Sequence, residues 1–487
     1  MRSFLLACAI VCLNLSLSQS SAFIYALWDL NLEAAEQALV HEWRPSYLTW
    51  AAHRLAFFKA LFPLHDTEKK DFWTFSGVCE RQFAAQRTPA VFPLKADLYG
   101  TRAIYAAWER QWLQAGLAVW QSWRYLHRSP KQTPLAWEWA GLWQVALATL
   151  PASYQKWLRF RPEFLWENAL ANLRQAALPP SPLAWEASLL YFLLLRNMDT
   201  LAGRWLDTCR QTLFPTQTPP FLWRFAIGVY EFEQGSLSRA ESIFLSLGRL
   251  PQASRFPYPW YWLGKVYLYQ GKASAAQQAW QTFVQLQRSS SGLAAQYAWR
   301  GYLAWVEGDS VAAQTLWKAA LSYESPWEED AIAQRLAAQW LRSPPTPEEE
   351  RLWTARWLLH QGAWQAAYDT LEPLRQRLYA LTPDQRTALY YTYGRLYHRW
   401  NREEAARFAY FQCLQQAAGT NRWMQAYAAL YLGQLYEKLA DWHNARRYYQ
   451  QAEALGEASH RTGVIQKARA GYLRLQNRRY PVPPSGK

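Results

Sequence analysis

The stretch Tyr258–Leu286, YPWYWLGKVYLYQGKASAAQQAWQTFVQL, carries the clearest evidence for the fold of this chain. A glycine divides it into two segments, and the apolar residues of each recur at the spacing of an amphipathic helix. The residues that set this spacing are Trp260, Leu263, Gly264 and Tyr267 before Gly271, and Ala276 and Trp280 after it. Two helices pack closely only where small side chains meet, so the stretch predicts an antiparallel pair in which Gly264 and Ala276 supply the contact.

The same pattern returns along the second half of the chain. Its most regular member is a small residue in each second helix, namely Ala240, Ala276, Ala313, Ala367, Ala406 and Ala445. Their spacings are 36, 37, 54, 39 and 39 residues, and the wide gap holds an extra helical segment at about 327–341. Because one pair cannot bury its apolar faces alone, such pairs stack around a continuous core, with the aromatic positions expected between adjacent pairs.

From Phe221 to about Ala470 this pattern resembles the tetratricopeptide repeat superfamily. The resemblance implies an all-α fold: an α-solenoid of antiparallel helix pairs, with more divergent helical repeats toward the N-terminus. It also implies a concave surface, lined by the first helix of each pair, that binds extended peptides or partner helices. A second segment, Gln144–Arg161, resembles a leucine–proline-centred signature of secreted or membrane-associated repeat proteins of Bacteroidota.

The sequence departs from the superfamily pattern at the positions that bind ligands in some of its members. Some tetratricopeptide domains hold a C-terminal carboxylate with Lys and Asn at set positions of the first helix. The matching positions here hold Phe225, Val229, Tyr261, Lys265, Ala298 and Tyr302, so that clamp is absent.

The chain organisation follows from its ends and its prolines. Residues 1–20 have the basic start, apolar run and small residues of a secretory signal peptide. We expect divergent helical repeats at 21–214, the repeat array at 221–480 and a disordered tail at 481–487, with the loop Pro215–Pro220 as the boundary. Three helix starts combine a Ser or Thr cap, a proline and a Glu or Gln: Ser325-Pro326 with Glu328, Thr346-Pro347 with Glu349, and Thr382-Pro383 with Gln385.

Charge and cysteines bear on partners and compartment. Lys and Arg total 52 and Asp and Glu 37, giving a net charge of +15 that is scattered rather than concentrated in one block. Acidic protein segments, acidic glycans, anionic lipids and nucleic acids all suit such a chain. The signal peptide predicts export to the periplasm or outer membrane, which argues against nucleic acid. After its removal Cys79, Cys209 and Cys413 remain; we expect buried thiols, with one disulfide as the alternative.

No pattern of catalytic chemistry accompanies the repeats. The eight histidines form no zinc-binding helix, and the sequence holds neither a glycine-rich phosphate loop nor a serine elbow. A lytic glycosidase with a helical superstructure would need an added lysozyme-like domain, and no non-repeat segment is long enough for one. The sequence therefore predicts a non-enzymatic protein without cofactor or metal.

Aromatic and basic residues at concave positions are the predicted partner-binding site, because such side chains are strong interface anchors. They are Tyr258, Tyr261, Lys265, Tyr302, Trp305, Tyr391, Arg395, His398 and Tyr427. Trp260, Trp280 and Trp317 are expected in the core. The leading hypothesis is a scaffold that holds an acidic or aromatic extended segment of a partner protein. The alternative is glycan binding through tryptophans outside the repeat positions, namely Trp137, Trp139, Trp143, Trp157 and Trp166.

Overall fold

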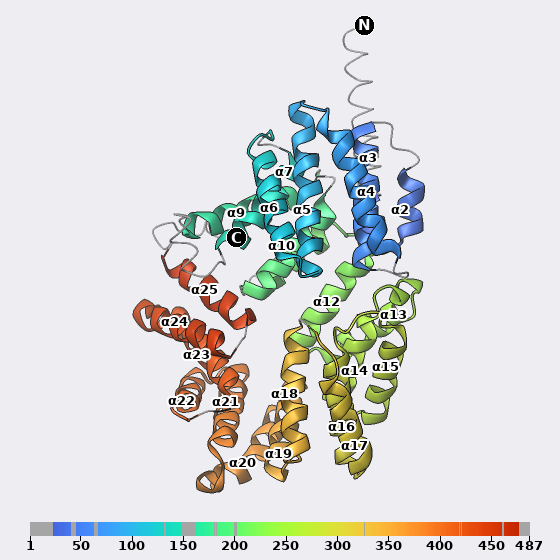
Figure 1. Ribbon diagram of the computed structural model, residues 1–487. Coiled ribbons are helices and arrows are strands. Elements are labelled where there is room, and N and C mark those ends of the chain that lie inside the picture. The colour runs from blue at the N-terminus through green and yellow to red at the C-terminus, as the bar shows by residue number, and fades with distance from the viewer. Residues whose placement is uncertain are drawn as a thin grey trace. The chain divides into compact units, whose positions relative to one another are not determined.

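The structure of the chain is a computed structural model (Figure 1). It describes residues 23–39, 45–62, 67–130, 133–148, 162–179, 181, 183–198, 202–325, 327–417, 419, 421–459 and 462–476. Within these ranges every regular element is a helix, and successive helices pack as pairs. The predicted all-α fold of helix pairs is therefore confirmed. The predicted signal peptide and tail lie outside the described residues.

The chain divides into two compact units. Unit 1 comprises residues 1–196, 200–226 and 254–256, and unit 2 comprises 197–199, 227–253 and 257–487. The division falls inside helix α12 (Phe221–Glu233), whereas the sequence analysis places a boundary in the preceding loop. No helix in the described ranges is both long and apolar enough to cross a lipid bilayer.

Unit 1 contains the less regular repeats of the N-terminal half. Its helices are α2 (Leu32–Leu39), α3 (Pro45–Leu61), α4 (Thr67–Ala84), α5 (Phe92–Trp108), α6 (Trp112–Leu126), α7 (Pro134–Ala148), α9 (Pro162–Ala177), α10 (Ala184–Met198) and α11 (Ala202–Thr212). The closest pairs are α3 with α4, α5 with α6, and α7 with α9. Helix α5 also contacts α3 and α7, so it lies between its neighbours in the core.

Unit 2 contains the regular repeats. Its helices after α12 are α13 (Leu237–Gly248), α14 (Tyr258–Tyr269), α15 (Ala273–Leu286), α16 (Leu293–Val306), α17 (Ser310–Leu321), α18 (Glu328–Arg342), α19 (Pro347–His360), α20 (Trp364–Gln376), α21 (Pro383–Arg399), α22 (Glu403–Leu414), α23 (Arg422–Lys438), α24 (Trp442–Ala458) and α25 (Thr462–Gln476). We call α14, α16, α19, α21 and α23 A helices, and their partners α15, α17, α20, α22 and α24 B helices; α12 and α13 precede them as an A and a B helix.

A glycine under an aromatic ring joins four of the five A–B pairs, and the exception is α19 with α20. A methyl group on Gly264 would lie 2.3 Å from Nε1 of Trp280, so only glycine fits beneath that indole. The same relation recurs at Gly301–Trp317, Gly394–Tyr410 and Gly433–Tyr449. The predicted Gly–Ala contact is incomplete: the side chain nearest to each glycine is the ring four residues after the alanine, within the same pair, and at Gly301 the carbonyl of Ala313 lies close as well.

Two of the predicted helix caps are confirmed and one is not. Thr346 and Thr382 each form a capping box, and a proline follows at the first helical position. Helix α18 begins instead after Trp327, whose own N–H donates to Ser325 Oγ at 3.1 Å, so Ser325 caps a turn rather than the helix. The extra helix predicted at about 327–341 is α18.

Helix α19 interrupts the simple stacking of the repeats. Its aromatic side chains recur at Trp353, Trp357 and His360, which places them on one face of the helix. The ring pairs are Trp353–Trp299, Trp357–Tyr302, His360–Tyr269 and His360–Phe232, with centroid separations of 4.9, 5.9, 4.8 and 5.7 Å. Helix α19 therefore lies across α12, α14 and α16, and covers the face that these A helices share.

The three described cysteines are free thiols and are buried. Burial raises the pKa of Cys79 to about 11 and that of Cys209 to about 12. These thiols are therefore protonated at neutral pH, and they act as small apolar core residues.

Candidate functional site

Three A helices carry a cation at one register position. Lys265, Arg356 and Arg395 each stand eleven residues before the alanine of the following B helix, which is Ala276, Ala367 or Ala406. The repeat geometry therefore turns all three toward the A-helix side of unit 2. We call these residues, with the rings around them, the tyrosine–arginine site.

Lys265 is the one cation of this set with a carboxylate partner. Its Nζ lies 2.6 Å from Oε1 of Glu329 on α18. The ammonium also lies 4.2 Å from the ring centroid of Trp262, a cation–π contact. Lys265 is therefore neutralised inside the protein.

Arg356 has no such compensation. Its Nε donates to Oγ1 of Thr392 at 3.2 Å, and its Cζ lies 4.6 Å from the ring centroid of Trp353. No carboxylate among the described residues pairs with its guanidinium. Burial lowers the pKa of Arg356 to about 10, so the group stays charged at neutral pH at a desolvation cost.

Arg395 is enclosed by tyrosines rather than by acids. It donates from Nη1 to the hydroxyl of Tyr431, and its Cζ lies 4.6 Å from the centroid of the same ring. After burial, the groups that act most strongly on its pKa are Tyr431, Tyr391, Tyr410 and Tyr427. Across the part of the chain that the structure describes, Arg395 forms no ion pair.

Burial and the positive charge of this site lower the pKa values of two histidines. Burial, with Arg395, Arg399 and Lys265 nearby, lowers the pKa of His360 to about 3. Burial and the same two arginines lower the pKa of His398 to about 4. Both imidazoles are therefore neutral at neutral pH. The site holds more positive charge than Glu329 balances, and an anion is the ligand that such a site favours.

The structure corrects part of the predicted site. Tyr261 and Tyr302 are 0% and 1% exposed, and Tyr391 is 9% exposed. Trp327 lies against Tyr261, and Trp357 of α19 lies against Tyr302, which is why neither ring reaches solvent. The expectation that these three rings line an open groove is therefore wrong.

The other predicted residues are partly buried. Tyr258 packs against Phe283 and Trp327, and Trp305 lies 6.2 Å from Trp317, so both belong to the first half of unit 2. The structure gathers the remaining four in the tyrosine–arginine site or at its edge, namely Lys265, Arg395, His398 and Tyr427. The indoles of Trp280 and Trp317 are fully buried as predicted, and Trp260 packs against the same core.

Sequence reasoning missed Arg356, Arg399, His360, Tyr269 and Tyr431. Arg356 could have been predicted from the sequence, because it stands at the same repeat position as Lys265 and Arg395. An alanine, Ala355, stands where the other two repeats have glycine, and α18 shifts the spacing by an added helix. His360 and Tyr269 enter the site through the packing of α19 on α12 and α14. Arg399 enters through its hydrogen bond to the carbonyl of Glu233, and Tyr431 through the packing of α23 on α21. No local sequence pattern predicts these contacts.

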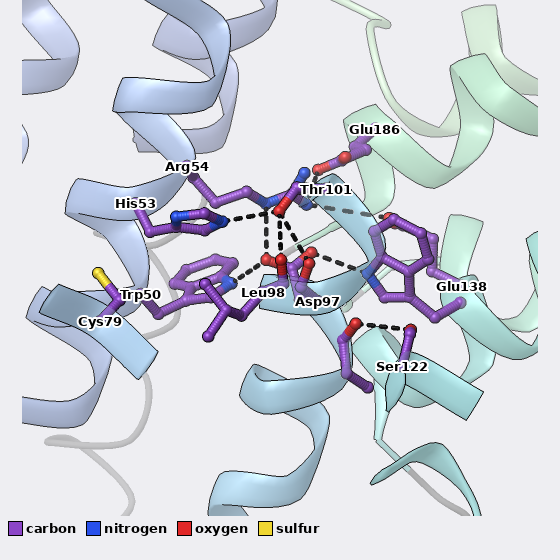
Figure 2. Close-up of polar contacts among 12 residues, drawn as sticks. Trp50, His53, Arg54, Cys79, Asp97, Leu98, Thr101, Ser122, Glu138 and Glu186 are labelled. Atoms are coloured by element: carbon purple, nitrogen blue, oxygen red, sulfur yellow. Dashed lines mark hydrogen bonds and ion pairs between the residues drawn. The ribbon is translucent and has the colours of Figure 1, made fainter. Parts of the chain in front are cut away.

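A second polar cluster lies in the interior of unit 1 (Figure 2). Arg54 of α3 lies 2.7 Å from Oε2 of Glu186, 3.4 Å from Oδ2 of Asp97 and 3.9 Å from Oε1 of Glu138. The four side chains come from α3, α5, α7 and α10, and none is more than 4% exposed. This network ties four helices together through one guanidinium.

The carboxyl groups of this network differ in their partners. Asp97 accepts from the indole N–H groups of Trp50 at 2.7 Å and Trp139 at 2.8 Å. Neither oxygen of Glu138 has a hydrogen-bond donor within the described ranges. Burial, and then the neighbouring Glu186, raise the pKa of Glu138 well above its usual value, which favours its protonated form. The network is therefore one cation facing three buried carboxyl groups, and burial raises the pKa of all three.

His53 completes the interior of unit 1. Its Nε2 lies 2.7 Å from Oγ1 of Thr101, and that hydroxyl donates to a backbone carbonyl of its own helix at 3.0 Å. The network therefore assigns the proton to Nε2. Burial lowers the pKa of His53 to about 3. Because these groups are closed off from solvent, we interpret the cluster as a structural network rather than as a reaction centre.

The tryptophans of the glycan hypothesis divide into two kinds. Trp139 and Trp143 donate inward, to Asp97 at 2.8 Å and to Ser122 Oγ at 2.9 Å. Trp137 instead lines a pocket of about 410 Å³ together with Trp123, Gln144 and Asn172. Trp157 and the side chain of Trp166 lie outside the described residues.

The chain is similar to known proteins only among solved structures, at low sequence identity. No family model and no curated protein matches the chain. Among solved structures, the apo form of the quorum sensor NprR from B. thuringiensis is 11% identical, with 90% of this chain and 97% of that chain covered at a TM-score of 0.29. The human IFIT1 dimer with m7Gppp-AAAA is 13% identical, with 93% and 95% covered at a TM-score of 0.31. At such scores the fold rests on the helices described above.

Proposed function

We propose that this chain is a non-enzymatic repeat scaffold that holds an anionic, extended segment of a partner protein at the tyrosine–arginine site. The observation that carries the proposal is the pair of partly buried guanidiniums, Arg356 and Arg395, that lack a carboxylate partner among the described residues. A guanidinium taken from water is costly unless an anion accompanies it. A Glu, Asp or C-terminal carboxylate supplies that anion, and the surrounding tyrosines provide hydrogen-bond donors and apolar ring faces.

The proposal places the scaffold in the cell envelope, on the strength of the signal-like residues 1–20. Fusing residues 1–30 to a reporter enzyme that is active only outside the cytoplasm tests this part. We expect activity from that fusion, and none when Leu5 and Leu6 are changed to Arg. Reporter activity that is absent from both would contradict an exported scaffold.

A crosslinked pull-down from the envelope fraction of the native host tests the binding role. The bait is the full chain, and the control bait carries Arg356→Met and Arg395→Met. The proposal expects a partner that the wild type captures and the control loses, with the crosslink mapped to an acidic segment. Equal capture by both baits would show that the partner binds elsewhere on the chain. Capture of nucleic acid in place of a protein would contradict the proposal of a protein partner.

Glycan binding is a second candidate because of the pocket lined by Trp123, Trp137, Gln144 and Asn172. The amide of Asn172 donates to Oε1 of Gln144 at 2.9 Å, so amides and indoles stand together. Aromatic faces stack on sugar rings, and amides bind sugar hydroxyls. Polysaccharide binding that Trp137→Ala abolishes and Arg356→Met leaves intact would favour this candidate.

A further inference from the structure

The outer face of α6 carries more exposed large apolar side chains than that of any other described helix. The large apolar side chains Trp112, Leu113, Leu117 and Trp120 are 70%, 79%, 57% and 58% exposed. They follow one another at helical spacing, and Ile104 and Trp108, 40% and 58% exposed, extend the patch onto the end of α5. We call these six residues the α6 patch.

Helix α6 is fixed with its small side chains inward. Ala115, Ala118 and Ser122 are buried against α5, and Ser122 Oγ donates to the carbonyl of Ala96 at 2.7 Å. The indole N–H of Trp143 then donates to the same Ser122 oxygen. A helix of a water-exposed repeat normally buries its large apolar residues, so α6 has the inverse arrangement.

Comparable helices of the same chain show what an ordinary outer face looks like. The exposed positions of α15 are Ser274, Gln278, Gln281 and Gln285, and those of α24 include Arg446 and Gln450. Exposed apolar patches of this size on a water-exposed protein mark an interaction surface. Other described helices expose at most two large apolar side chains, as α22 does with Phe408 and Phe411, whereas α6 alone exposes four.

The charged residues around the α6 patch indicate which kind of surface it binds. Arg110, Arg124 and Arg128 are exposed along the same hairpin, and none forms an ion pair with a described residue. The guanidinium of Arg124 lies 5.5 Å from the ring centroid of Trp120, and Glu109 is the one acidic residue in the segment 104–128. Tryptophan and leucine between arginines is the composition of helices that lie in the headgroup region of anionic bilayers.

We propose that the α5–α6 hairpin docks on an anionic lipid surface, with Trp112, Leu113, Leu117 and Trp120 entering the headgroup boundary and the three arginines contacting lipid phosphates. This surface belongs to unit 1 and is independent of the tyrosine–arginine site of unit 2. The proposed contact is an attachment to the bilayer surface.

Vesicle co-sedimentation of the full chain tests the proposal. The probes are vesicles of phosphatidylcholine mixed with phosphatidylglycerol, and vesicles of phosphatidylcholine alone. We expect binding to the mixed vesicles, reduced at least about tenfold by the combined changes Trp112→Ser, Leu113→Ser and Leu117→Ser. The matched control changes three exposed apolar residues of unit 2, Val311→Ser, Phe408→Ser and Leu439→Ser, and retains binding.

A charge series separates this surface from the general basicity of the chain. Changing Arg110, Arg124 and Arg128 to Glu is expected to weaken binding by about fivefold or more per residue. Changing Arg288, Arg446 and Arg447 to Glu gives the same net charge and is expected to weaken it far less. Equal losses in the two triple variants, or no vesicle binding by the wild type, would overturn the proposal. Self-association that the serine variant abolishes, without vesicle binding, would assign the α6 patch to a second copy of the chain.

Discussion

The Nε of Arg356 donates a hydrogen bond to Oγ1 of Thr392 at 3.2 Å, and this contact joins α19 to α21. Thr392 stands one helical turn before Arg395, so the bond brings two A-helix guanidiniums to one region of unit 2. Tyr391 lies close enough to both that each lowers its pKa, although burial outweighs them and raises it overall. The two like charges are held together by rings and hydroxyls, and this arrangement favours an anion between them.

Replacing Arg356 by Met should stabilise the ligand-free protein. The change removes a desolvated cation and keeps much of its volume, so we expect the free energy of unfolding to rise by about 1 kcal/mol or more. Thermal unfolding of the ligand-free chain measures this. The control is Arg335→Met, an exposed arginine of α18, which should change stability by less than about 0.5 kcal/mol. A marked loss of stability in Arg356→Met would show that the guanidinium is structurally compensated.

Replacing Gly264 by Ala should destabilise unit 2. The new methyl group would lie 2.3 Å from Nε1 of Trp280 and would displace the indole, whose N–H donates to the carbonyl of Tyr261 at 3.0 Å. We expect a loss of about 1–3 kcal/mol in chemical denaturation. Gly116→Ala on α6, where no atom lies within 4 Å of the new methyl, is expected to be neutral or to stabilise by up to about 1 kcal/mol. Equal changes in stability in the two variants would mean that Trp280 does not restrict position 264 to glycine.

The two glutamates of the unit 1 network should respond differently to amide substitution. The pKa of Glu138 is raised by folding, so its contribution is most favourable below the unfolded value of about 4.5 and is lost as pH rises above it. Glu138→Gln should therefore flatten the fall in stability with rising pH and cost little at neutral pH. Glu186→Gln should destabilise by about 2 kcal/mol or more, because Arg54 loses its 2.7 Å partner. Unfolding measured from pH 4 to pH 8 distinguishes them, and matching profiles would contradict this assignment.

The histidine of α19 should make the protein acid-sensitive. The pKa of His360 falls from 6.5 to about 3 on folding, so the unfolded chain binds the proton more tightly. The stability that it contributes is complete above about pH 6.5 and is lost as pH falls below that value toward 3. His360→Phe keeps a ring against Phe232 and should reduce this acid loss. The control His443→Phe, at an exposed position of α24, should leave the dependence of stability on pH as in the wild type. An equal reduction of the acid loss by both variants would show that His360 is not its cause.

Much of the fold could be predicted from the sequence because its determinants are local. The helix-B alanines, the Thr346 and Thr382 caps and the extra helix α18 all follow from residues that lie within one repeat. The ring that covers each glycine was assigned to the wrong neighbour, because spacing alone does not say which helix an aromatic side chain meets.

The site was predicted less well because it depends on long-range packing. Periodicity places Tyr261 and Tyr302 on the A-helix face, but it does not show that α18 and α19 cover them. Arg356 was detectable from its register, whereas its meeting with Thr392 depends on how α19 packs against α21. The unit 1 network around Arg54 joins residues as far apart as Glu186, in repeats too irregular to align.

Calorimetric titration of the full chain with a short oligoglutamate peptide tests the proposed anion-binding site. We predict binding that weakens with salt, and a loss of at least about tenfold in affinity in the Arg356→Met, Arg395→Met double variant. An oligolysine peptide, and the Arg335→Met variant, serve as controls for charge and for substitution. Binding of equal strength to the wild type and the double variant, or no binding of the acidic peptide to either, would contradict the assignment of an anion-binding scaffold.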